Sequence, residues 1–303
     1  MEGVRRWWQE LAGLVLPAEC GGCGSARTVL CPQCRAALSG AVPFRVRPVL
    51  EPPGLPAVHA AARYADEVRA VLLAHKERGA LTLARPLGAA LAGAVRVGVG
   101  EGEGEGPQPP GGLLLLVPVP SARAAVRARG HDPARRIALA AAGELRRAGM
   151  PARVAAVLRQ RRAVADQSGL DSRQRLNNLV GALAVVPGGA RVLRGGRVVL
   201  VDDLVTTGAS LMEAARAVRT ATTVEERLEG QEGLEREGRV GRREEAERGM
   251  DAEGAPAVYV GVTREGRKVK PSGVREAGMG GAGDVLCAAV VAASPDSFEI
   301  NRN

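Results

Sequence analysis

The stretch VVLVDDLVTTGASL, residues Val198 to Leu211, decides the fold of this chain more than any other part of its sequence. It begins with an apolar run, continues into the acidic pair Asp202 and Asp203, and then reaches a Thr-Thr-Gly turn. An apolar run without polar alternation is typical of a strand buried on both faces of a sheet. We therefore predict a parallel-sheet strand over Val198–Val201, followed by the turn and by a helix over Ser210–Arg219.

The residue types of this turn suit a phosphorylated sugar. Backbone N–H groups at a helix start, with threonine and serine hydroxyls beside them, form an anion site. Gly208 lets the backbone approach a phosphate because it has no Cβ. Asp202 and Asp203 would lie where ligands bind in such sheets, and they could accept hydrogen bonds from vicinal ribose hydroxyls. The alternative is that Asp203 merely caps the turn, which the close succession of these residue types disfavours.

Strands and helices alternate along the rest of the chain. The other predicted strands are Leu113–Val119, Arg153–Leu158, Ala257–Val262 and Val285–Ala292. The other predicted helices are Val4–Leu16, Asp66–His75, Leu81–Val95 and Pro133–Ala148. This alternation predicts an α/β fold with a doubly wound parallel sheet flanked by helices.

Composition divides the chain into two predicted domains. Residues 1–41 would form an N-terminal helix and a cysteine module, and residues 57–303 the larger domain, with a proline-rich linker over Val42–Pro56 between them. Inside the larger domain, the Gly- and Glu-rich residues 98–112 predict a flexible loop. Residues 221–256, dense in Glu, Arg and Gly, predict a disordered insertion or a solvated charged helix. A polar loop is expected over Gln160–Asn178.

Four cysteines form two Cys-x2-Cys pairs near the N-terminus. They are Cys20, Cys23, Cys31 and Cys34. This arrangement can offer four thiolates to one tetrahedral Zn²⁺, and such a closed site would serve folding or docking rather than catalysis. A redox pair or an iron–sulfur cluster is the competing interpretation. The fifth cysteine, Cys287, lies in an apolar run and is expected in the core.

The charge of the chain suggests partners without identifying them. Its 42 basic and 33 acidic residues give a formal net charge of +9, and nearly all the basic residues are arginines. Nucleic acid or phosphate binding and a general arginine bias explain this equally well. No stretch has the roughly 18 apolar residues that a membrane span needs, so we expect a cytoplasmic protein. Lys76, in the last turn of a predicted helix, either reaches a phosphate or simply follows the helix dipole.

Four segments together resemble the ComF/GntX family, which is amidophosphoribosyltransferase-like. The Val198–Ser210 segment resembles the phosphoribosyl pyrophosphate (PRPP) motif of type I phosphoribosyltransferases. The segment LLLVPVPSARAAVRARGHDPARR, Leu114–Arg136, resembles the family's strand, pyrophosphate loop and following helix start. Arg161–Asn178 resembles its flexible loop, and Cys20–Cys34 its N-terminal cysteine cluster. His131 and Asp132 depart from the family, which more often has an aromatic residue and asparagine there.

The resemblance implies a type I phosphoribosyltransferase-like fold with a small zinc module, and a role for each matching residue. Asp202 and Asp203 would hold the ribose hydroxyls. The 5-phosphate would be cradled by Thr206, Thr207, Gly208, Ala209 and Ser210, and the pyrophosphate loop would consist of Pro120, Ser121 and Ala122. In or beside the mobile loop that closes over the site would lie Arg162, Gln167, Arg173 and Asn177. Closure of this loop would bring Arg162 and Arg173 to the departing pyrophosphate, so they join the acidic pair as catalytic candidates.

Three functions follow from these observations. The first is a Mg²⁺-dependent phosphoribosyltransferase that transfers ribose 5-phosphate from PRPP to an unknown acceptor and releases pyrophosphate. The second, which the ComF resemblance implies, is a non-catalytic accessory protein of DNA uptake and natural transformation that keeps the fold and binds single-stranded DNA or DNA-uptake proteins. The third is a zinc-ribbon nucleic-acid binder. The acidic pair favours the first two, and an oligomer is compatible with each.

Overall fold

The structure is a computed structural model, and it describes residues 19–49, 51–102, 112–162, 174, 178–225, 227 and 285–295. The chain forms two compact units, residues 1–222 with 280–303 and residues 223–279. Since the second unit contains few described residues, the following account concerns the first. The predicted helix Val4–Leu16 and the predicted strand Ala257–Val262 lie outside the described residues.

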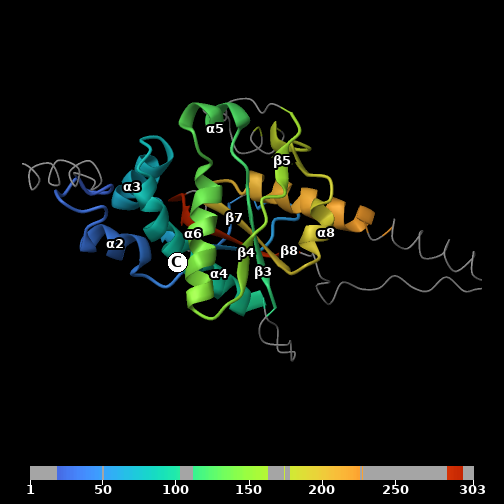
Figure 1. Cartoon of the computed structure of the whole chain (residues 1–303), viewed down its shortest axis with the longest axis horizontal. Helices are drawn as coiled ribbons and strands as arrows, with labels where there is room; N and C mark the ends of the chain where they lie inside the picture. Colours follow the sequence, from blue (N-terminus) through green and yellow to red (C-terminus); the bar gives the residue numbers. More distant parts are fainter. Residues whose placement is uncertain are drawn as a thin grey trace, which may run out of the picture. The chain divides into compact units, whose positions relative to one another are not determined.

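A six-stranded sheet forms the centre of this unit (Figure 1). Its strands in spatial order are β1 (Phe44–Val46), β2 (Val58–Arg63), β8 (Val285–Ala293), β7 (Arg197–Val205), β3 (Leu114–Pro118) and β4 (Ala152–Val154). Only β1 runs antiparallel to its neighbour, and all other pairs are parallel. The protein therefore has an α/β fold with a mostly parallel, mixed sheet. The proline-rich stretch predicted as a linker contains β1, which completes one edge of the sheet.

β7 occupies an interior position in the sheet because it pairs with β3 on one side and β8 on the other. Val198 to Val201 are fully buried, as the apolar run predicts. The strand is longer than predicted, however, and the acidic pair lies within it rather than after it. Pairing with β8 continues as far as Val205, opposite Ala293, and this extends the strand beyond the apolar run.

Helices cover both faces of the sheet. On one face lie α3 (Asp66–Lys76), the 3-10 turn η1 (Leu81–Leu83), α4 (Ala84–Gly102) and α6 (Pro133–Arg147). On the other face lie α8 (Gly189–Leu193) and the helix that begins at residue 209 and runs to 225. Side chains of β7 alternate between these layers: Val199 and Val201 pack toward α4 and α6, and Val198 and Leu200 toward the opposite layer.

The cysteine segment packs into the same core as α3 and α4. It includes α2 (Pro32–Ser39), which begins directly after Cys31 and contacts both α3 and α4. Leu30 and Leu38 are buried in the hydrophobic cluster that contains the inner sides of α3 and α4. The cysteine segment is therefore part of the layer that covers this face of the sheet.

Three predicted boundaries need correction. α4 continues to Gly102, so the first residues of the predicted loop over 98–112 are helical. The helix after β7 continues past Arg219 into the predicted insertion over 221–256, and buried Thr222 bonds back to the carbonyl oxygen of Val218. The predicted strand Arg153–Leu158 is interrupted, because β4 ends at Val154 and a new strand begins at Leu158.

That new strand belongs to a separate two-stranded antiparallel sheet formed by β5 (Leu158–Gln160) and β6 (Leu183–Val185). The fully buried carboxylate of Glu213 anchors this sheet to the helix after β7, since it accepts the Leu183 N–H at 3.0 Å. Arg216 pairs with Glu213 and also donates to the Leu183 carbonyl oxygen at 3.1 Å. The sequence analysis anticipated neither β6 nor this anchor. Among the described helices, none is long and apolar enough to cross a membrane.

The packing of α6 predicts a sharp contrast between two of its residues. Ile137 is fully buried, whereas Leu139 is 55% exposed on the same helix. Ile137→Ala should lower the free energy of unfolding by about 2–5 kcal/mol because it leaves a cavity. Leu139→Ala should change it by less than about 0.5 kcal/mol. Chemical denaturation of both variants checks this layer assignment, and equal losses would contradict it.

Candidate functional site

Two predicted site segments meet at one edge of the sheet. β3 and β7 are parallel neighbours, and their pairing extends to the Val119 N–H, which donates to the Val201 carbonyl oxygen at 2.9 Å. The loop Pro120–Ala122 therefore leaves β3 beside the point where the acidic pair follows on β7. Ligands of parallel α/β sheets bind at this carboxyl edge.

The acidic pair forms a compact network with a lysine from α3. The Asp203 carboxylate is almost fully buried, and its Oδ2 lies 3.0 Å from Nζ of Lys76. Asp202 Oδ1 accepts a hydrogen bond from the backbone N–H of Asp203 at 2.8 Å. Because Lys76 ends α3 while the aspartates belong to β7, tertiary packing rather than local sequence creates this contact.

The network alters the protonation of Asp202 and of Lys76. Burial of its carboxyl group, reinforced by the negative charge of Asp203, raises the pKa of Asp202 well above its usual range, and the charge of Lys76 offsets this in part. The charge of Asp203 raises the pKa of Lys76 against the opposing effect of burial. Lys76 is thus held as an ammonium ion, and Asp202 keeps its proton to higher pH than an exposed aspartate would.

The turn after β7 contains a glycine that another residue could not replace without strain. Residues Thr206 to Gly208 bend the chain, and the following helix starts at residue 209. Gly208 has φ = 75°, in the left-handed region that favours glycine, and a Cβ there would also lie 2.9 Å from the side chain of Leu55. The predicted phosphate-cradle residues Thr206, Thr207, Gly208, Ala209 and Ser210 are therefore consecutive residues of this turn and the first turn of a helix.

Asp132 holds the other predicted loop in place. Its Oδ2 accepts the Ser121 N–H at 3.2 Å, and its Oδ1 accepts the Arg135 N–H at 3.1 Å as the N-cap of α6. One carboxylate thus joins the loop Pro120–Ala122 to the start of α6. Between them lies the short helix α5 (Arg123–Arg129), none of whose residues is buried.

The residues before Asp132 contact the last turn of α3 and the residue that follows it. His131 Nε2 lies 3.2 Å from the His75 carbonyl oxygen, and the two imidazole rings are 5.6 Å apart. Arg129 Nη1 donates to Glu77 Oε1 at 2.8 Å. We call these two contacts the α3 clasp. Together they hold the residues on either side of Lys76.

The arginine-containing loop predicted to close over the site is described only at its ends. Arg162 donates to the carbonyl oxygens of Asn178 and Val180 at 2.8 and 3.0 Å, so its guanidinium group joins the two ends of the loop. The other predicted loop residues, Gln167, Arg173 and Asn177, lie outside the described residues. Lys76 could be given no single role from sequence because its partner Asp203 is distant in the chain. The N-cap role of Asp132, by contrast, had a local signal, since Asp132 directly precedes Pro133 at the helix start.

The four cysteines come together as their spacing predicts. The Sγ atoms of Cys20, Cys23, Cys31 and Cys34 all lie within 4.8 Å of one another. Four thiolates at tetrahedral positions about 2.3 Å from a zinc ion would be about 3.8 Å apart, so this cluster could bind a structural metal ion. A Cβ at Gly22 would lie 2.6 Å from Sγ of Cys34, which explains the glycine at that position. Among the described residues, no other cluster of this kind is found.

The protein environment prepares part of this cluster to bind a cation. Burial alone would raise the pKa of Cys20, but backbone N–H groups of Cys31, Cys23 and Gly22 outweigh it and lower that pKa to about 6. The Cys31 N–H lies 3.3 Å from Cys20 Sγ. Burial and the neighbouring thiols raise the pKa of Cys34 instead. A bound cation would favour deprotonation of all four thiols.

Comparison with known proteins identifies no relative: no protein-family model matches the chain, and no curated protein is significantly similar to it.

Metal binding at the cysteine cluster should contribute to stability. The purified protein should contain about one divalent metal ion per chain, and Cys34→Ser should abolish this and lower the melting temperature. Cys287→Ser is the matched control, because Cys287 is a buried cysteine outside the cluster. Elemental analysis and thermal unfolding provide the two readouts. A metal-free wild-type protein, or metal retained by Cys34→Ser, would contradict the prediction.

Proposed function

We propose that this chain is a phosphoribosyltransferase-like protein of the ComF family that binds PRPP at the carboxyl edge of β3 and β7. The observation that carries the proposal is the acidic pair on β7 followed at once by the turn and helix start at residues 206–210. Carboxylates suit vicinal hydroxyls, and N–H groups at a helix start suit a phosphate. This order along the chain matches the order of ribose and 5-phosphate in the ligand.

Each part of PRPP has a partner in this proposal. Asp202 and Asp203 accept the ribose hydroxyls, and residues 206–210 bind the 5-phosphate. The loop Pro120–Ala122, held by Asp132, approaches the pyrophosphate. The departure of Asp132 from the family's usual asparagine is compatible with this role, since its carboxylate anchors the loop through Ser121. Transfer then moves ribose 5-phosphate to an acceptor nucleophile and releases pyrophosphate. The family resemblance assigns Arg162 and Arg173 to the pyrophosphate; Arg162 would have to leave the carbonyl oxygens of Asn178 and Val180 to reach it.

In this proposal Mg²⁺ binds to the phosphates of PRPP rather than to a preformed protein site. Asp203 is already paired with Lys76, and Asp202 accepts a backbone N–H, so these side chains form no ready inner-sphere cage for a metal. Mg²⁺ keeps several waters and commonly binds through substrate phosphates, and it would neutralise the pyrophosphate here. For the cysteine cluster we propose Zn²⁺, because four thiolates in tetrahedral arrangement select zinc or iron–sulfur sites and the cluster is small and closed.

The acidic pair provides the direct test of PRPP binding. Calorimetric titration with PRPP and Mg²⁺ should show binding that is about a hundredfold weaker in Asp202→Asn/Asp203→Asn, since two charge-assisted hydrogen bonds of about 1.5–3 kcal/mol each are weakened. The control is Asp66→Asn/Glu67→Gln, an acidic pair in the first turn of α3. Binding that is unaffected by the β7 variant, or absent from the wild type, would refute the proposed site.

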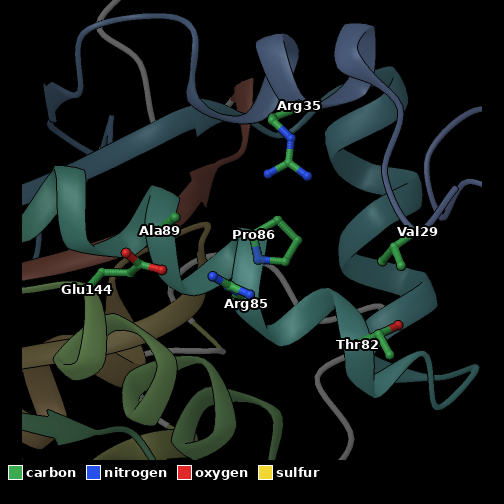
Figure 2. A pocket seen from close by; sticks show the side chains of 7 residues that line it. All are labelled: Val29, Arg35, Thr82, Arg85, Pro86, Ala89 and Glu144. Carbon is green, nitrogen blue, oxygen red and sulfur yellow. The ribbon is translucent and has the colours of Figure 1, made fainter. Parts of the chain in front are cut away.

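A second function, binding of single-stranded DNA by an accessory protein of DNA uptake, is favoured by a separate observation. Three neighbouring pockets along α4 and α6 share lining residues, and we call them together the arginine groove. Figure 2 shows the one that adjoins the cysteine segment. The exposed basic side chains of the arginine groove are Arg35, Arg85, Arg96, Arg135, Arg136 and Arg147. Figure 2 shows Arg35 reaching into the groove from α2, across from Arg85 of α4.

The charges of the arginine groove are only partly neutralised within the protein. Its acidic residues are already engaged: Glu144 pairs with Arg147, and Asp132 bonds to backbone N–H groups. A row of guanidinium groups attracts the phosphates of a strand without reading its bases. Aromatic side chains, on which bases commonly stack, do not line the groove among the described residues, so the backbone phosphates would supply the affinity.

Salt dependence tests this second function. Affinity for a labelled single-stranded oligonucleotide, measured by fluorescence anisotropy, should fall with salt concentration. In Arg35→Ala/Arg85→Ala the slope of log K against log salt should be smaller by about 1.4, since each lost phosphate contact contributes about 0.7. Arg69→Ala/Arg191→Ala removes two exposed arginines outside the groove and should leave the slope unchanged. Equal slopes in all proteins would contradict a role for the groove.

A further inference from the structure

Lys76 occupies an unusual position in an arginine-rich chain. The only lysines in the sequence are Lys76, Lys268 and Lys270. The ammonium group of Lys76 lies 3.0 Å from the buried Asp203 carboxylate. An ammonium group is a compact point charge, whereas a guanidinium group is a wide planar fork. Lysine therefore places a full positive charge on one carboxylate oxygen and leaves room beside it.

The backbone around Lys76 is held from two directions. The α3 clasp ties His75 and Glu77, its two chain neighbours, to the segment that leads into α6. The opposite side of α3 packs against the cysteine segment, where a Cβ at Gly22 would lie 3.3 Å from Cγ2 of Val71. A side chain whose backbone is fixed on both sides can hold its partner in a defined geometry.

The same segment also holds the loop after β3. Asp132 follows His131 directly, and its carboxylate accepts the Ser121 N–H at 3.2 Å. Residues 129–132 therefore connect the last turn of α3, which presents Lys76 to β7, with the loop that leaves β3. The side chain of Lys76 is 37% exposed, so one side of the ion pair with Asp203 is accessible from solvent.

We propose that Lys76 is a positioning residue of the phosphosugar site: its ammonium group, paired with Asp203 Oδ2, fixes that carboxylate near the end of β7, where it can accept ribose hydroxyls. This role rests on the proposed PRPP-binding function and assigns the residue that prepares the site for its ligand. It also gives the α3 clasp a function, because the clasp fixes the backbone from which Lys76 extends.

Removal of Lys76 should change the pH at which the ligand begins to bind. The charged and titratable groups around the pair are Asp202 and Asp203 on β7, Glu77 beside Lys76 on α3, and Arg129 on α5. Lys76 lowers the pKa of Asp202, which burial and the charge of Asp203 raise. Without Lys76 that pKa rises further, so the fully ionised acidic pair forms only at higher pH. Ligand binding that needs the ionised pair must then begin at higher pH.

The ion pair itself can be tested without any ligand. Lysine-selective isotope labelling should give few NMR signals, because the chain has so few lysines. The Lys76 ammonium should titrate at higher pH in the wild type than in Asp203→Asn, since the charge of Asp203 is the main cause of its raised pKa. Identical titration curves would overturn the ion pair and the proposal with it.

The positioning role is tested by calorimetric titration with PRPP at several pH values between about 6 and 9. Lys76→Met should weaken binding at neutral pH by about tenfold and move the onset of binding to higher pH. Lys76→Arg keeps the charge and should keep the pH onset of the wild type, with lower affinity because the wide guanidinium group occupies the space beside Asp203. Arg69→Met removes a charge from an exposed position on the same helix and should match the wild type.

The outcomes separate this inference from the function on which it rests. If the wild type binds PRPP and Lys76→Met binds with the same affinity and pH profile, the role of Lys76 is overturned while PRPP binding stands. If Lys76→Met loses affinity with an unshifted pH profile, Lys76 contacts the ligand or supports the fold and does not position Asp203. If the wild type does not bind PRPP, the proposed function fails first.

Discussion

β7 lies between β3 and β8, and its backbone is paired on both sides. Because Val198 to Val201 are buried under helices on both faces, their N–H and C=O groups have no access to water and must bond to neighbouring strands. This requirement aligns the carboxyl ends of β3 and β7 at one edge of the sheet. The acidic pair and the loop after β3 meet there as a consequence, and the candidate site depends on this pairing.

The helical layer on one face connects this edge to the cysteine cluster. α2 begins directly after Cys31 and contacts α3, and the last residue of α3 is paired with Asp203. The cluster, α3 and the acidic pair are therefore successive contacts in one packed layer. A metal ion at the cysteines would stabilise the segment against which α3 packs.

The sequence predicted the buried strands and the cysteine cluster well, because these depend on local patterns. Continuous apolar runs predicted β3, the first part of β7 and nearly all of β8, and the Cys-x2-Cys spacing predicted a cluster that could hold a metal. It did not predict β1 and β2 at the sheet edge: β1 is short and lies in a proline-rich stretch, and β2 is largely alanine, which favours strands weakly.

Side-chain contacts across the fold were beyond sequence reasoning. Lys76 and Asp203 are far apart in the chain, and only the docking of α3 beside β7 brings them together. The hydrogen bond between the Ser121 N–H and Asp132 likewise corresponds to no motif that can be recognised in the sequence. The length of β7 was underestimated because charged residues normally end a buried strand. Here β8 continues the pairing past them.

A crystal structure of the protein grown with PRPP and Mg²⁺ tests the central claim most directly. The account predicts ligand density at the carboxyl edge of β3 and β7, with ribose hydroxyls on Asp202 and Asp203 and the 5-phosphate at residues 206–210. Density for the ligand elsewhere, or an acidic pair with no ligand beside it at saturating PRPP, would contradict it.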